Sequence, residues 1–520
     1  SSRDGYQVTF KITEGQQFSV GQVNTISEVD GVDTAEFERA ARLRQGGVYN
    51  PSDVDNAIAR MERLAAQKGL NFITVEPRIV RNEREGTLDV TLAITRGPRV
   101  IVERIDIEGN QTTLDRVVRS EFRTVEGDPF NPRAIRESAE RIRALGFFNK
   151  ADVDAREGSS PQQVIIDVDV EEKPTGSISF GGSYSTQNGF GAAFSFSERN
   201  FLGRGQAFSF RINTAADTQQ YGLRFVEPGL FGRDLSLGFT LAYTETDNDN
   251  AVFDTTTGVF QPFLEFPVAE QARLQLRYSL DYGEITSVDA GVGGIVTAEA
   301  AEGERFDSSL GYTYIFDTER KGLDPNTRYR FEFGQDFAGL GGDTTFVKTS
   351  AKAIAQTMVW NEEVTLRATL EGGALNYTKG DSRVTDRFLL GPDVMRGFTT
   401  GGIGPREIGP GGIDDSLGGN FYAVARFEAE FPLGLPEEYG ITGGLFYDIG
   451  SVWGLSDATK NKVGAGNTVV STGFDARHVV GFSIFWKSAI GPLRLNFTEA
   501  LQKSKWDEPQ NFNLTISTQF

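Results

Sequence analysis

The sequence predicts a membrane all-β fold: a 16-stranded antiparallel transmembrane β-barrel preceded by tandem α+β modules. Residues 1–173 mix helical and strand periodicities, whereas residues 174–520 show almost only the two-residue period of strands. The composition changes at Glu171-Glu172-Lys173-Pro174, which we interpret as the domain boundary. No apolar run reaches the roughly 18 residues that a membrane helix needs, but a transmembrane strand needs only about 10 alternating residues.

Composition excludes several classes of site. The chain has 520 residues, 52 basic and 72 acidic, for a formal charge of −20, with one histidine and no cysteine. Disulfides, thiolate zinc sites, iron–sulfur clusters, cysteine nucleophiles and multi-histidine metal sites are therefore excluded. An acidic chain without a basic block is poorly suited to nucleic acid. Because Gly-x-Ser-x-Gly and Walker motifs are also missing, we predict no enzyme activity, no metal and no cofactor.

The first part of the chain contains a repeat. Tyr49-Asn50-Pro51 recurs as Phe130-Asn131-Pro132, and in both places asparagine can cap a helix whose first residue is proline. Each copy ends in a segment with the alternation of a strand. We predict one α+β module over residues 15–96 and a second, adjoining the barrel, over residues 97–173.

Two further features belong to this repeat. Each module has an earlier helix, opened by Asp33-x-x-Glu36 or by Thr112-x-x-Asp115, which resemble capping boxes. Residues 1–14 copy the end of the first module, so we interpret them as the last strand of a truncated upstream module. The alternative is a lone β-arm.

The second part of the chain, residues 174–520, is expected to form the barrel. Aromatic residues alternate there with serine, arginine and asparagine, as expected for strands with lipid on one side and water on the other. Soluble β-sandwiches, the alternative, also need alternation, but the apolar face here continues over many strands. The predicted strands are 175–185, 189–200, 205–215, 218–228, 233–245, 252–266, 270–284, 304–316, 327–338, 344–359, 363–376, 420–431, 440–450, 477–487, 491–501 and 511–520.

The longest connection, loop six at 377–419, carries a motif. Met395-Arg396-Gly397-Phe398 resembles the Val/Ile-Arg-Gly-Phe/Tyr motif in the sixth extracellular loop of the BamA family, with Met395 as a mild departure. Phe446-Tyr447-Asp448-Ile449-Gly450 resembles the family's Phe-x-Asp-x-Gly, and the repeated modules resemble POTRA modules. The resemblance covers nearly the whole chain.

The resemblance implies a function and a location. BamA-family factors fold and insert β-barrel clients into the bacterial outer membrane without nucleotide, with their POTRA modules in the periplasm. The implied partners are unfolded outer-membrane β-barrel proteins, periplasmic lipoprotein subunits and outer-membrane lipid. The alternatives are a two-partner secretion exporter, a TamA-like translocation or assembly module, and a passive porin or outer-membrane enzyme.

Periodicity gives Arg396 two candidate partners. Glu428 shares one face of its strand with Arg426, and Asp448 shares one face of its strand with Phe446. Both carboxylates should point into the lumen, where a guanidinium can bridge them. We therefore expect loop six to fold inward, with Arg396 against Asp448, Glu428 or both. The alternative is an arginine exposed on a surface loop.

The seam between the first and last strands is the predicted gate. Its first strand carries Gly176, Gly181 and Gly182, and glycine weakens strand pairing. An open seam would offer unpaired N–H and C=O groups to an incoming strand. The alternative is that the glycines only relieve curvature. The last strand places its apolar residues on one face: Phe512, Leu514, Ile516 and Phe520.

Overall fold

A computed structural model describes the chain in two compact units. The described residues are 16–70, 72–97, 100–185, 189–215, 218–247, 253–269, 271–289, 291–318, 326–360, 362–488 and 491–517. The strand predicted within residues 1–14 lies outside these ranges. Within the described residues, no helix is both long enough and apolar enough to cross a bilayer.

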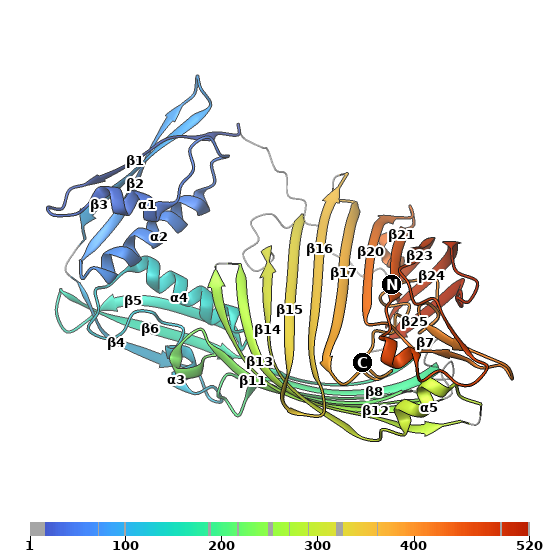
Figure 1. The fold of residues 1–520 in the computed structure, drawn as a ribbon. Helices are drawn as coiled ribbons and strands as arrows, with labels where there is room; N and C mark the ends of the chain where they lie inside the picture. The colour runs from blue at the N-terminus through green and yellow to red at the C-terminus, as the bar shows by residue number, and fades with distance from the viewer. Residues whose placement is uncertain are drawn as a thin grey trace, which may run out of the picture. The chain divides into compact units, whose positions relative to one another are not determined.

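The first α+β module packs two helices on a three-stranded sheet (Figure 1). Its elements are β1 (Ser19–Ser27), α1 (Thr34–Ala41), α2 (Pro51–Gln67), β2 (Ile73–Asn82) and β3 (Thr87–Arg96). The sheet order is β1-β3-β2, with β1 parallel and β2 antiparallel to β3. Asp33 caps α1 by accepting from the N–H of Ala35, and Asn50 accepts from the N–H of Ser52 at the start of α2.

The second module repeats this arrangement around a sheet of order β4-β6-β5. Its elements are β4 (Ile101–Glu108), α3 (Asp115–Arg119), α4 (Pro132–Ala144), β5 (Phe148–Glu157) and β6 (Gln163–Glu172). Asn131 caps α4, accepting from the N–H groups of Arg133 and Ala134, and Pro132 is the first helical residue.

The predicted capping box at Thr112-x-x-Asp115 is wrong. No side chain caps α3, which lasts five residues. The N–H groups of Thr112 and Thr113 instead donate to the carboxylate of Glu172, at 3.0 and 2.6 Å. Residues 111–120 and Glu172 belong to the same compact unit as the barrel.

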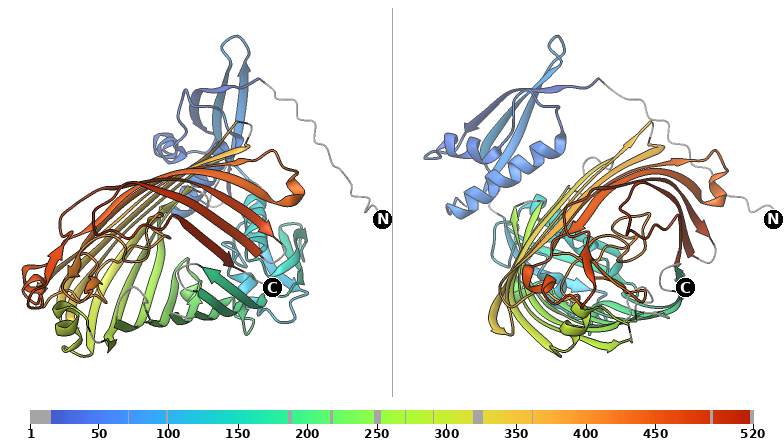
Figure 2. Two further views of the ribbon diagram at one scale, coloured as in Figure 1. Left: turned by 90° about the vertical axis from the view of Figure 1, so that its right-hand side faces the viewer. Right: turned by 45° about the vertical axis from the view of Figure 1, so that its right-hand side comes forward.

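Sixteen antiparallel strands form the barrel, which confirms the predicted fold class (Figures 1 and 2). Each strand pairs with its neighbour in the ring, and β25 pairs with β7. The strands are β7 (Gly176–Ser185), β8 (Gly189–Phe201), β9 (Gln206–Ala215), β10 (Thr218–Glu227), β11 (Ser236–Asp247), β12 (Phe253–Ala269), β13 (Ala272–Val288), β14 (Arg305–Asp317), β15 (Thr327–Gly342), β16 (Thr345–Val359), β17 (Val364–Lys379), β20 (Phe421–Pro432), β21 (Ile441–Trp453), β23 (Arg477–Ser488), β24 (Gly491–Gln502) and β25 (Phe512–Ser517).

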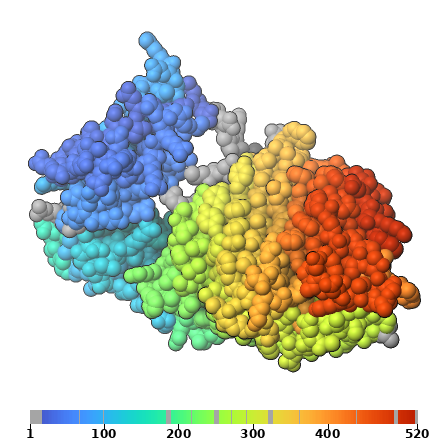
Figure 3. Space-filling model, in the orientation of Figure 1, coloured from blue at the N-terminus to red at the C-terminus, as the bar shows by residue number. Residues whose placement is uncertain are grey.

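Apolar side chains cover the outer face of the barrel and polar side chains fill the inner one. Phe180, Phe194 and Phe210 form a row on β7, β8 and β9, with ring centroids 5.0 and 6.3 Å apart. On the inner face, Arg277 makes two 2.8 Å hydrogen bonds to Asp336. The outer surfaces of β15, β16 and β17 can be followed in Figure 3 as a continuous yellow-to-orange band. An apolar outer face and a polar inner face are what period-two alternation predicts for strands between lipid and water.

The long connections fold together at one end of the barrel. They contain α5 (Gly294–Ala300), β18 (Arg406–Ile408), β19 (Asp414–Ser416), α6 (Asp457–Lys460) and β22 (Thr468–Val470), and short 3₁₀ helices η1 (Leu230–Gly232) and η3 (Glu437–Tyr439) lie at other turns. β18 pairs with both β19 and β22, so loop six and the loop after β21 share one small sheet. A second apolar core, which includes Ile295, Val384 and Leu417, lies beside this sheet. We call this assembly the loop cap.

Candidate functional site: the loop-six anchor

The anchor is built on two adjacent strands. In β20 and β21, Arg426 pairs with Asp448 and Glu428 pairs with Phe446, so both carboxylates lie on the same face of the sheet. The side chains of Asp448 and Glu428 are almost fully buried. Loop six, the connection between β17 and β20, runs inside the ring of strands (Figure 2) and brings Arg396 to them.

Arg396 binds both predicted partners. Its Nε donates to Asp448 Oδ2 at 2.7 Å, and its Nη2 donates to Asp448 Oδ1 at 2.5 Å. Its Nη1 donates to Glu428 Oε2 at 2.5 Å. The guanidinium carbon also lies 3.6 Å from the ring centroid of Phe446, within cation–π range. A planar fork that engages two carboxylates fixes the loop in orientation as well as in position.

Glu428 is shared by three arginines. Besides Arg396, it accepts from Arg367 Nη1 on β17 at 3.2 Å and from Arg494 Nη2 on β24 at 2.8 Å. Because β24 is the neighbour of the last strand, β25, this carboxylate connects loop six to the seam side of the barrel. Periodicity predicts that Glu428 faces inward, but it does not predict its contacts with Arg367 and Arg494.

The rest of the motif packs against the barrel wall. Met395 and Phe398 are buried in an apolar cluster with Phe446, Val452 and Val479. Gly397 has φ +88°, and a β-carbon there would lie 2.7 Å from Val479 Cγ1. Glycine is therefore required at this position both by its backbone conformation and by the close approach of β23.

Loop six also binds the connection between β24 and β25. Phe398 forms an isolated β-bridge with Pro509, and the N–H of Gln510 donates to the carbonyl of Gly397 at 2.9 Å. Arg406 pairs with Glu508 and with Asp414. The motif thus holds the chain that leads directly into the last strand.

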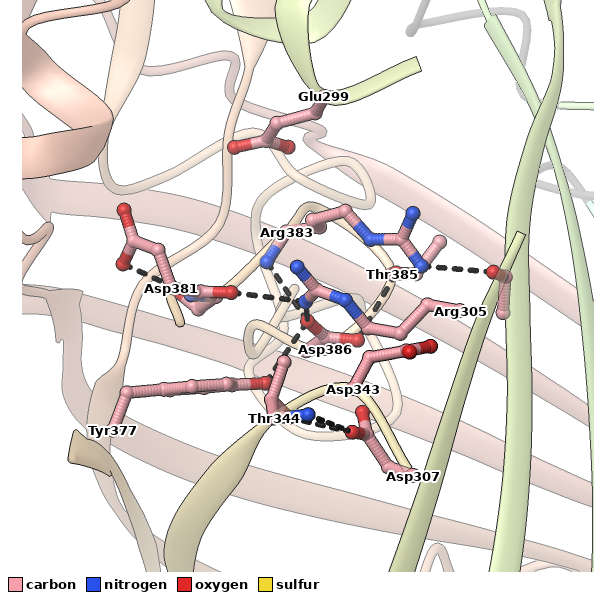
Figure 4. A network of polar contacts seen from close by, with 12 residues as sticks. Glu299, Arg305, Asp307, Asp343, Thr344, Tyr377, Asp381, Arg383, Thr385 and Asp386 are labelled. Carbon is pink, nitrogen blue, oxygen red and sulfur yellow. Dashed lines mark hydrogen bonds and ion pairs between the residues drawn. The ribbon is translucent and has the colours of Figure 1, made fainter. Parts of the chain in front are cut away.

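A second polar network was missed by sequence reasoning (Figure 4). Arg305 Nη1 donates to Asp386 Oδ2 at 2.8 Å, and the Tyr377 hydroxyl donates to the same oxygen at 3.0 Å. Arg383 donates instead to two backbone carbonyls, those of Gly303 and Gly283. The one available signal was the charged run 381–387 inside a loop, which a solvated surface would also explain.

An ion pair with no exposed surface lies close to this network. Arg387 donates to both oxygens of Glu299 on α5, at 2.9 and 3.0 Å, and both side chains are 0% exposed. Arg387 Nε donates in addition to the carbonyl of Leu417 at 2.6 Å. These bonds tie the start of loop six to the helix between β13 and β14.

Carboxylates of loop six also cap α5. Glu407 accepts from the N–H groups of Gly294 and Ile295, and also from the Gly464 N–H and the Asn467 side chain. Burial alone would raise the pKa of Glu407, but these four hydrogen bonds outweigh burial and lower it. Asp415 accepts from the Gly293 N–H, yet its pKa is raised, chiefly by burial and also by the nearby Glu407 charge.

The predicted seam residues lie on β7 and β25. Gly181 and Gly182 pair with Ala193 and Ala192 of β8, and Gly176 pairs with Glu198. In the described residues, β25 pairs with β7 from Thr515–Ser185 to Ser517–Ser183, which is three residue pairs, whereas β7 and β8 share ten.

The apolar residues predicted on the last strand lie on β25. The ring of Phe512 lies 5.3 Å from that of Phe497, and Leu514 pairs with Leu495. The backbone of Ile516 pairs with that of Tyr184, and Phe520 lies outside the described residues.

Comparison with known proteins identifies the family. The Omp85 superfamily domain matches residues 200–520, and the POTRA model, described as a surface antigen variable number repeat, matches residues 18–97 and 100–173. The chain is 28% identical over its full length to the outer membrane protein assembly factor BamA of Neorickettsia risticii, covering 68% of that protein. It is 25% identical over its full length to the BamA of Neisseria meningitidis, covering 69%.

Solved structures share the fold over nearly the whole chain. The crystal structure of BamA from Haemophilus ducreyi lacking POTRA domains 1–3 superimposes with a TM-score of 0.68 and 19% identity, over 97% of this chain and 100% of that one. The present chain spans about two thirds of the length of the curated relatives. The chain belongs to the Omp85 superfamily and, within it, to the BamA family of outer-membrane proteins with periplasmic POTRA modules.

Proposed function

We propose that this protein serves outer-membrane protein assembly by folding β-barrel clients and inserting them through the seam between β7 and β25, without nucleotide. The relatives named as BamA support the assembly role and β-barrel proteins as clients. The seam carries the mechanistic part of the proposal, because it is where the first strand of the barrel, with its three glycines, meets the last strand.

The seam suits strand exchange for a physical reason. A closed barrel is stable in lipid because no backbone N–H or C=O is left unpaired, so separating two fully paired strands is expensive. The seam is easier to separate than a fully paired strand interface, because β7 carries Gly176, Gly181 and Gly182 and glycine weakens strand pairing. The edges released in this way would bind an extended client segment through main-chain hydrogen bonds.

Loop six is proposed to keep the barrel intact while the seam works. The Arg396 anchor joins loop six to β20 and β21, and Glu428 extends the connection to β24. These strands can therefore remain a rigid wall while β25 moves.

The POTRA modules are proposed to receive partners at their sheet edges. β1 and β2 are the outer strands of the first module, and β4 and β5 are those of the second. Strand addition at such an edge would suit unfolded clients or periplasmic lipoprotein subunits.

A disulfide across the seam tests the proposal, since the chain has no native cysteine. Ser185→Cys with Thr515→Cys joins a residue pair of the β7–β25 register. In liposomes without nucleotide, oxidation should abolish insertion of an unfolded β-barrel client, and reduction should restore it. A matched lock between β8 and β9, Ser197→Cys with Ser209→Cys, should have no effect. Undiminished insertion with the seam locked would refute the gate.

A further inference from the structure

A pocket in the barrel lumen lies between loop six and the seam strand. It has a volume of about 240 Å³ and is lined from loop six, β16, β17, β20, β24 and β25. Asn513 and Thr515 of β25 form one side, and Arg396 of the anchor forms another. A strand that entered at the seam would therefore have this pocket within its reach.

The lining is cationic although the protein as a whole is acidic. It contains five basic side chains and two acidic ones, Asp393 and Glu428. The basic residues are Lys352, Arg367, Arg396, Arg426 and Arg494. Two more carboxylates, Glu371 and Asp448, contact these cations without lining the pocket. The printed ion pairs of the five cations involve three carboxylates, those of Glu371, Glu428 and Asp448, and two of these three do not line the pocket.

Two donors of these cations have no acceptor among the described residues. In the described part of the chain, the Arg426 Nε is buried without a hydrogen-bond partner. Arg494 donates through Nε to the amide oxygen of Asn496 and through Nη2 to Glu428, which leaves Nη1 unengaged among the described residues. The cations lack acceptors because they share carboxylates. Glu428 accepts from three arginines, and Glu371 contacts both Arg426 and Lys352.

We propose that this luminal pocket binds a carboxylate of an extended client peptide. A carboxylate accepts several hydrogen bonds at once and is strengthened by arginine forks away from bulk water. The volume suits one such group. A polypeptide is the favoured source because Asn513 and Thr515 of β25 line the pocket, and the proposed function places the client strand at β25. The carboxylate can come from a chain terminus or from an acidic side chain.

The labelling rate of a cysteine introduced at Thr515 measures the electrostatic potential in the pocket. Thr515 is exposed and lines the pocket, and the native chain has no cysteine, so the introduced thiol is the only one in the variant. In detergent-solubilised full-length Thr515→Cys, an anionic methanethiosulfonate should react about tenfold faster than a cationic one, after normalisation to a free thiol. Thr313→Cys is the matched control, because Thr313 lies beside the mutually paired Arg277 and Asp336. A preference for the cationic reagent at position 515 would overturn the inference.

Protection of the cysteine at position 515 from labelling by added peptides tests whether the pocket binds a carboxylate. The probe is acetyl-Thr-Val-Thr-Val-Thr-Val-Thr, made with a free carboxylate, as an amide, and as an amide whose last residue is glutamate. The free-carboxylate peptide should slow labelling at position 515 several-fold, whereas the neutral amide should not. Protection by the glutamate peptide identifies the side chain as a second source. Equal protection by all three peptides, protection by none, or protection by inorganic phosphate alone would overturn the inference.

Two substitutions complete the test. Arg494→Met should remove the protection, and Lys352→Met, at a half-exposed side chain, provides a variant that should retain the fold. Both should lower the preference for the anionic reagent. Because the inference rests on the proposed function, client insertion is measured in parallel. Normal insertion without protection refutes only the pocket, and protection without insertion refutes only the insertase.

Discussion

Arg396 and Asp448 form a two-point ion pair inside the barrel, with Nε to Oδ2 at 2.7 Å and Nη2 to Oδ1 at 2.5 Å. The two side chains are 6% and 0% exposed. The residues are separated by 52 positions in the sequence, so this contact decides the path of the whole of loop six.

Replacing Arg396 by alanine should destabilise the barrel by about 3–5 kcal/mol, because it leaves Asp448 buried without its partner. Urea unfolding of the reconstituted protein and protease digestion of loop six are the measurements. Arg367→Ala is the control, since Arg367 also pairs with Glu428 but is 39% exposed and should cost at most about 1 kcal/mol. Similar losses for both variants would contradict the anchor.

Gly397→Ala should destabilise more than Gly411→Ala. Both glycines have positive φ, +88° and +82°, so both substitutions strain the backbone by about 1–2 kcal/mol. Only at Gly397 does the new β-carbon also meet Val479, which should add about 1–3 kcal/mol of overpacking. Thermal unfolding monitored by gel mobility measures the difference. Val479→Ala should relieve the overpacking part, and its failure to do so would argue against the close approach.

The Arg387–Glu299 pair should show strong coupling in a double-mutant cycle. Either single substitution, Arg387→Met or Glu299→Met, leaves a fully buried charge alone and should cost about 3–5 kcal/mol. The double substitution removes both charges and should cost less than the sum of the two. The free energy of unfolding of the four proteins gives the coupling. Additive effects would show that the pair contributes little.

Acid should loosen the loop cap through Glu407. Its pKa in the folded protein is lowered from the ordinary value of 4.5, so its stabilising contribution is complete above that value and is lost as pH falls through the lower folded pKa. Asp415, whose pKa is raised, works in the opposite sense: its ionisation costs stability as the pH rises above its ordinary value of 3.8. The rate of proteolysis of loop six, measured between pH 7 and pH 3, should give the net effect of these two carboxylates on the stability of the loop cap.

Glu407→Gln isolates the first of these contributions. The variant should be more protease-sensitive at neutral pH than the native chain and should lose the sensitisation that acid causes through Glu407. Asp457→Asn, which removes an exposed charge on α6, is the control and should leave the profile unchanged. An unaltered profile in Glu407→Gln would show that the α5 cap does not control the loop cap.

The sequence by itself determined the barrel strands and, for the strands that became β20 and β21, the side that faces the lumen. Alternation with period two arises because successive residues face lipid and water in turn, so it can be recognised from neighbouring residues alone. The strand predicted at 420–431, for example, is β20, Phe421–Pro432. The same alternation placed Glu428 and Asp448 in the lumen, and the arginine in the loop-six motif identified their partner. Asn131 likewise marked the start of α4 because its capping bonds involve only the next residues.

Only the tertiary structure decided which distant charges meet. Arg387 and Glu299 are separated by 88 positions, and no local pattern encodes their contact. The failed prediction at Thr112 has the same cause, because Glu172, 60 positions away, binds the N–H groups that a local cap would have bound. Three arginines converge on Glu428 only because the ring of strands places β17, β24 and loop six around it. Which side chains meet across the closed sheet depends on how its strands are placed. That placement exists only in the folded protein, so no local pattern in the sequence encodes it.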